Sequence, residues 1–91
     1  MHHKIKEILN SVFQPEWLEI VDEGTQHSGH RHAGEGHYAI KVVSSAFRNQ
    51  KPLDRHRAVY AALKTQMGMG IHALAIKTFT PEEWEKRQSP E

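Results

Sequence analysis

Residues between two β-rich segments, 37–43 and 71–79, have the pattern of a helix, and this constrains the fold more than any other feature. Pro52 suits the first turn of that helix, because the N–H it lacks would be unpaired there. We expect the helix to end at Gly68 and Gly70, since glycine favours the left-handed geometry of helix C-termini. A strand, a crossover helix and a second strand form a right-handed unit with parallel strands. The predicted inward stripe of the helix is Leu53, His56, Val59, Tyr60, Leu63 and Met67.

The rest of the chain adds two helices and one strand to this unit. Residues 5–13 repeat apolar side chains at helical spacing, and Pro15 stops that helix. Residues 17–22 are aromatic and β-branched, which predicts a strand antiparallel to 37–43. Thr80 and Glu83 bracket Pro81 in the pattern of a capping box, so a final helix carrying Trp84 begins there. The apolar face of the first helix contains Ile5, Ile8, Leu9, Val12 and Phe13.

The resulting element order is α-β-β-α-β-α. Its 91 residues suffice for one domain, which we place over residues 1–91. The predicted fold class is α+β, with a three-stranded mixed sheet and helices on one face. Along residues 37–43, Tyr38, Ile40 and Val42 share the face expected to be buried.

The chain has eight histidines and no cysteine. A disulfide framework, a cysteine zinc finger and a catalytic thiol are therefore excluded together. His2 and His3 could derive from a vector and are set aside. The formal net charge of +1 gives no strong electrostatic signature of nucleic-acid binding. No apolar run approaches the length of a membrane span and residues 1–6 contain no secretory signal, so we expect a cytoplasmic protein that does not contact membranes.

Residues 24–36 form an expected loop that is rich in glycine and histidine. His27, His30 and His32 lie in it, and His30 and His32 would point the same way in an extended segment. Imidazole binds zinc, copper, nickel and iron. No spacing here matches a zinc module, however, so taken alone this segment is more typical of a solvated loop than of a metal site.

His72 stands in an otherwise apolar strand, before Leu74 and Ile76. The ordinary interpretation is a partly buried histidine whose ring nitrogens are hydrogen-bonded. Parallel strands would nevertheless bring His72 to the same end of the sheet as His37 and the loop. His72 and a loop histidine are therefore an alternative ligand pair.

Cations are expected on the outer side of the middle helix: Lys51, Arg55, Arg57 and Lys64. Such a helix can approach phosphates, although most basic runs are solvated faces. The sequence has no cysteine, no Walker-type phosphate loop and no G-x-S-x-G elbow, so binding or transfer is favoured over catalysis.

These segments together resemble the BolA-like family over residues 5–86. The resemblance implies a fold similar to the type II KH domain. It also implies partnership with a monothiol glutaredoxin in iron–sulfur cluster handling, and in some bacterial members DNA-binding regulation of stress response and cell morphology. The matching segments are Leu18–Glu23, Gly36-His37-Tyr38, Phe47, Leu53-Asp54-Arg55-His56-Arg57 with Tyr60, and Ile71–Ile76 with Thr80 and Trp84.

By position, the resemblance assigns cluster ligation to His72 and a loop histidine, His30 first, with His27 and His32 as alternatives. One departure is Asn49, where the family often has glycine; asparagine tolerates the left-handed conformation at modest cost. A second departure is the absence of the loop cysteine found in one subgroup.

A 2Fe–2S cluster takes four ligands and favours thiolates, with histidine accepted on one iron. This chain offers only imidazoles, so the thiolates would come from the glutaredoxin and from glutathione. The isolated chain should bind a cluster poorly, and we expect it to be a monomer or a weak homodimer. The alternatives are a regulator that binds duplex DNA through Lys51, Arg55, Arg57 and Lys64, and divalent-metal binding by the loop.

Overall fold

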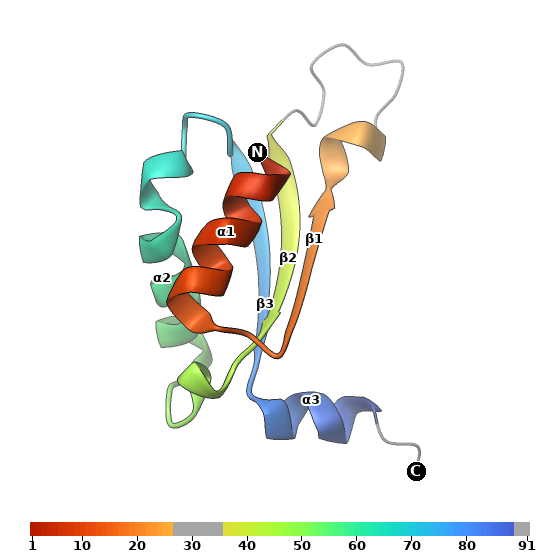
Figure 1. Ribbon diagram of the computed structural model, residues 1–91, viewed down its shortest axis with the longest axis vertical. Helices are drawn as coiled ribbons and strands as arrows, with labels where there is room; N and C mark the ends of the chain where they lie inside the picture. Colours follow the sequence, from red (N-terminus) through yellow and green to blue (C-terminus); the bar gives the residue numbers. More distant parts are fainter. Residues whose placement is uncertain (27–35, 89–91) are drawn as a thin grey trace.

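A computed structural model of the chain describes residues 1–26 and 36–88. β1 and β2 pair antiparallel and β2 and β3 pair parallel, so the strand order is β1-β2-β3. The predicted α+β class, element order and three-stranded mixed sheet are confirmed (Figure 1). The helices and strands are α1 (His2–Phe13), β1 (Trp17–Asp22), β2 (His37–Val43), α2 (Pro52–Ala62), β3 (Ala73–Phe79) and α3 (Pro81–Gln88).

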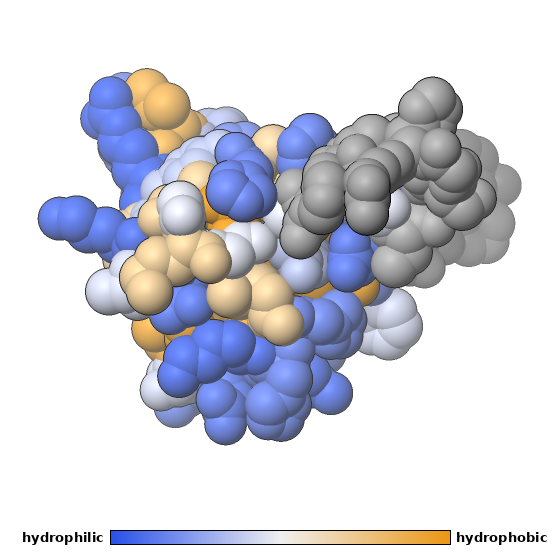
Figure 2. All heavy atoms as spheres, turned by 90° about the horizontal axis from the view of Figure 1, so that it is seen from above, coloured by the Kyte–Doolittle hydropathy of each residue, from blue (hydrophilic) through white to orange (hydrophobic). Residues whose placement is uncertain are grey.

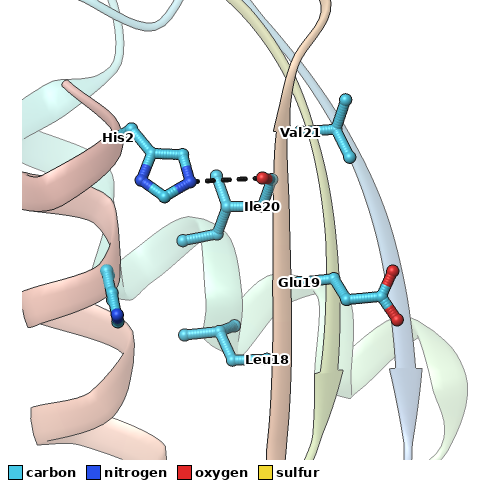
Figure 3. Close-up of a pocket in the computed structure, with 6 residues that line it drawn as sticks. His2, Leu18, Glu19, Ile20 and Val21 are labelled. Atoms are coloured by element: carbon cyan, nitrogen blue, oxygen red, sulfur yellow. Dashed lines mark hydrogen bonds between the residues drawn. The ribbon is translucent and has the colours of Figure 1, made fainter.

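Helices α1 and α2 cover one face of the sheet, and the core lies between them and the strands (Figure 1). Side chains alternate along β1, where Leu18 and Ile20 point toward α1 and Glu19 and Val21 point away (Figure 3). The opposite face of the sheet is therefore left outside the core. The buried apolar side chains of the core cluster are Ile5, Leu9, Phe13, Tyr38, Ile40, Val42, Phe47, Val59, Leu63 and Ile71.

Helix α1 buries Ile5, Leu9 and Phe13, which recur every four residues. Val12, predicted to share this stripe, is 54% exposed, so the buried stripe is narrower than the apolar pattern. The helix ends where expected, because Gln14 adopts the left-handed conformation and Pro15 follows.

The predicted inward stripe of α2 is wrong at two positions. Leu53 is 60% exposed and Tyr60 is 42% exposed, while Arg55 is only 8% exposed. The Arg55 guanidinium donates from Nε to the Gln50 carbonyl at 2.8 Å and from Nη1 and Nη2 to Glu83 at 2.7 and 3.2 Å. Because these bonds satisfy the buried charge, the helix turns its arginine inward and its apolar neighbours outward.

Helix α2 ends at Ala62, six residues before the predicted end at Gly68. A short 3-10 helix, η3 (Lys64–Gln66), follows it. Gly68 then takes a φ of 84°, and its N–H donates to the Ile71 carbonyl at 2.7 Å. This turn redirects the chain into β3, so Gly68 shapes the turn rather than the helix end.

The capping box at α3 is confirmed. The Thr80 hydroxyl accepts from the Glu83 N–H at 3.1 Å, and the Glu83 carboxylate accepts from the Thr80 N–H at 2.9 Å. The same carboxylate pairs with Arg55, so it joins α3 to α2. The Arg55 hydrogen bond, followed by the Thr80 N–H bond, lowers the pKa of Glu83.

Two further expectations concern local geometry and membranes. Asn49 has a φ of 65°, so it adopts the left-handed conformation expected of it. None of the helices in the described residues is long and apolar enough to cross a membrane.

Candidate functional site

His72 lies immediately before β3, at the end of the sheet where β2 begins. The backbone N–H groups of His72 and Ala73 both donate to the Gly36 carbonyl, at 2.8 and 3.2 Å. The register places His37 beside Ala73. Parallel pairing therefore brings His72 against the residue that follows the histidine-rich segment, as predicted.

The His72 imidazole packs directly on Gly36. Gly36 is buried with a φ of 76°, and a Cβ atom there would lie 2.4 Å from Cδ2 of His72 and 3.0 Å from the Gly70 carbonyl oxygen. No side chain fits between the ring and the backbone of residue 36. Glycine at this position thus allows the imidazole its place at the end of the sheet.

The interpretation of His72 as a partly buried, hydrogen-bonded residue is wrong. Its side chain is exposed, because the strand begins at Ala73, two residues later than the apolar pattern suggests. Within the described residues its ring nitrogens have no hydrogen-bond partner. From the end of the molecule where α1 begins, the described surface mixes hydrophilic side chains with a paler, mildly hydrophobic area near its centre (Figure 2). His72 therefore presents an imidazole that an external group can use.

The other histidines differ in their positions. His27, His30 and His32 lie outside the described residues, so the assignment of one of them as a ligand stays a prediction. His37 is exposed at the start of β2, and His56 is half-buried on α2. Residues 1–26 and 36–88 contain no group of three histidine, cysteine or acidic side chains that could hold a metal ion. Within these residues, His72 is therefore not part of a complete metal site.

The predicted basic surface of α2 is smaller than expected. Lys51, Arg57 and Lys64 are exposed, and the Arg57 side chain, 72% exposed, lies 3.9 Å from Asp54. The expectation that Arg55 lies on the outer face is wrong, because its guanidinium is buried and paired with Glu83. Three cations of the predicted four therefore remain available to a phosphate backbone.

Residues 9–83 match the BolA-like protein family. The chain belongs to this family. It is 38% identical over 88 residues to the DNA-binding transcriptional regulator BolA of Escherichia coli (strain K12), a match that covers 97% of this chain and 83% of the relative. It is 41% identical over 80 residues to human BolA-like protein 1, covering 88% of this chain and 58% of the human protein.

A solved structure supports the same relationship for this BolA-like chain. The BolA domain of SufE1 from Arabidopsis thaliana superposes with a TM-score of 0.78 at 38% identity, covering 89% of this chain and 92% of that domain. The family and its fold, which the sequence suggested by resemblance, are therefore confirmed.

Two features of this end of the molecule were missed by the sequence analysis. The sequence pattern places Gly36 among several loop glycines, and its contact with His72 depends on the pairing of β2 with β3 and on the position of the ring. The exposed Tyr60 hydroxyl donates to the Leu74 carbonyl at 3.1 Å, which satisfies an acceptor of the edge strand β3. A pattern of apolar residues cannot reveal either contact, because both join residues far apart in the chain.

Proposed function

We propose that this BolA-like protein pairs with a monothiol glutaredoxin and contributes His72 to a 2Fe–2S cluster that the two proteins bind or transfer. The observation that carries the proposal is the exposed imidazole of His72, held against Gly36 at the end of the sheet where β2 begins. A loop histidine, His30 or else His27 or His32, supplies the second imidazole. The role is binding and transfer, without catalysis.

Ligand chemistry explains why a partner is needed. Iron–sulfur clusters favour thiolate ligands and accept imidazole on one iron. The chain has no cysteine, so it provides no thiolate. The cysteine of the glutaredoxin and the thiol of glutathione complete the set of ligands. The cluster is cargo shared between two proteins, and its role in the cell is iron–sulfur or iron homeostasis.

Visible circular dichroism of cluster-loaded monothiol glutaredoxin tests this proposal. Adding the wild-type chain should change the spectrum, because its two imidazoles replace ligands that are present in the glutaredoxin alone. His72→Ala should remove that change. His56→Ala is the matched control, since His56 is half-buried on α2, and it should behave as wild type. An unchanged spectrum with the wild-type chain would contradict the proposal.

Binding of duplex DNA is the second candidate function. It is favoured by the 38% identity to a relative named as a DNA-binding transcriptional regulator, and by the exposed Lys51, Arg57 and Lys64. If these side chains contact phosphates, Arg57→Ala should reduce the slope of log affinity against log salt by about one. Lys4→Ala on α1 is the control and should leave the slope unchanged. Binding seen solely at low salt would argue against a regulatory role.

A further inference from the structure

The face of the sheet opposite α1 and α2, here called the open face, carries side chains in ordered rows. The strand register places Glu19, Lys41 and Lys77 side by side across the three strands. The next row is Val21, Ala39 and Ala75, whose small side chains give the open face a flat floor. A shallow groove of about 260 Å³ runs over both rows.

An aromatic cluster closes one end of the open face. Trp84 of α3 stacks on Trp17 of β1, with ring centroids 6.2 Å apart and an interplanar angle of 24°, and it also contacts Phe79 at 5.2 Å. The Trp17 indole N–H donates to the Glu19 carboxylate at 2.6 Å. Although it is held by these contacts, Trp17 is 49% exposed. It is therefore a fixed aromatic platform that the fold does not bury.

Cations lie beside the aromatic cluster of which Trp17 is part. Lys41 Nζ lies 5.4 Å from the Trp84 ring and 3.9 Å from Glu19, and the Arg87 guanidinium lies 5.3 Å from the Phe79 ring. Lys77 is exposed and has no ion pair among the described residues. On α3, Glu82 and Glu83 are engaged by Arg48 and Arg55, and Glu85 also has a partner.

Among the described residues of the three strands, the carboxylate on the open face is Glu19, which is already bound to Trp17 and Lys41. The cations of the face outnumber Glu19, because they include Lys41, Lys77 and Arg87. The charge of the open face therefore suits an anionic ligand. A hollow of about 410 Å³ between Trp17, Glu19, Lys41 and Trp84 leaves room for a planar group beside the rings.

We propose that the open face binds single-stranded nucleic acid, with one base stacked on Trp17 and the phosphodiester passing over Lys41 and Lys77. Single-stranded nucleic acids require two elements of a binding surface: exposed aromatic rings on which bases stack, and cations that contact the phosphates. A duplex keeps its bases stacked within the helix and cannot offer one to Trp17. The open face is also separate from the basic surface of α2, which lies across the sheet (Figure 1).

Fluorescence anisotropy of a labelled twelve-residue oligothymidylate, titrated with the full chain, tests this inference. Trp17→Ala and Lys77→Glu should each weaken binding about tenfold, as expected for the loss of base stacking or of a phosphate contact. Lys4→Glu on α1 makes the same charge change elsewhere and should weaken binding less than threefold. In a Trp84→Phe background, the oligonucleotide should quench Trp17 fluorescence, which keeps the test valid if Trp17→Ala fails to fold.

Three results would overturn the inference. Equal competition by a duplex of the same length would show that no base is read by stacking. Equal competition by polyglutamate would assign the face to an acidic protein. Sedimentation of the wild type as a dimer that Lys77→Glu dissociates would make the face an interface between two copies, with Glu19 of each facing Lys77 of the other. All three outcomes are independent of the cluster proposal, which depends on His72.

Discussion

Gly36→Ala is expected to displace the His72 imidazole and to lower the free energy of unfolding by about 2 kcal/mol. The new Cβ would lie 2.4 Å from Cδ2 of His72, so either the ring moves or the starts of β2 and β3 separate. The φ of 76° adds strain, because side chains other than glycine rarely adopt it. Urea unfolding measures the stability loss. In visible circular dichroism with cluster-loaded glutaredoxin, Gly36→Ala should behave like His72→Ala and remove the spectral change that the wild-type chain causes.

Gly68→Ala separates the effect of backbone strain from the effect of displacing His72. Gly68 has a φ of 84°, similar to that of Gly36, but a Cβ there would have no atom within 4 Å. This variant should therefore lose about 1 kcal/mol through backbone strain and retain the wild-type cluster response. Were Gly36→Ala and Gly68→Ala to give the same cluster response, the packing of His72 on Gly36 would have no part in binding.

Arg55→Ala is expected to be strongly destabilising although it changes a charged residue, at about 3 kcal/mol. It removes a buried guanidinium that holds Glu83 and the Gln50 carbonyl, and it leaves a cavity beneath α2. Arg57→Ala is the matched control two residues away. Its side chain is 72% exposed, so the loss should be within about 0.5 kcal/mol. Equal effects of the two variants in urea unfolding at neutral pH would contradict the buried pairing.

The cost of Arg55→Ala should also depend on pH. Arg55 is the main cause of the lowered pKa of Glu83. A carboxylate with a lowered pKa stabilises the fold above its ordinary pKa, and this contribution disappears as pH falls through the lowered value. The difference in unfolding free energy between wild type and Arg55→Ala should therefore shrink in acid. The part due to lost packing should remain, and a difference constant from neutral to strongly acidic pH would rule out the ionic contribution.

Much of the fold follows from local signals in the sequence. The bounds of β1 and β2, the stop before Pro15 and the capping box at Thr80 were predicted because each depends on neighbouring residues. The inward face of α2 was not, because the burial of Arg55 depends on Glu83, which lies 28 positions later. Apolar periodicity assigns a charged residue to solvent unless its partner is known.

The candidate site was likewise predicted only in part from the sequence. Crossover topology alone placed His72 at the end of the sheet where the histidine-rich segment begins. Its exposure and its packing on Gly36 depend on atomic contacts that no spacing reveals. The aromatic cluster of the open face was likewise missed, since Trp17 and Trp84 stand at opposite ends of the chain and meet through the register of the sheet.

Pulsed electron paramagnetic resonance of the reduced cluster tests the central claim most directly. The cluster is formed with unlabelled monothiol glutaredoxin and glutathione, and with this chain labelled in its histidines with ¹⁵N. We predict ¹⁵N hyperfine coupling from a directly bound imidazole, with the His72 contribution lost in His72→Ala and retained in His56→Ala. A reduced cluster without ¹⁵N coupling, or with a spectrum unchanged by His72→Ala, would contradict the assignment of His72 as a ligand.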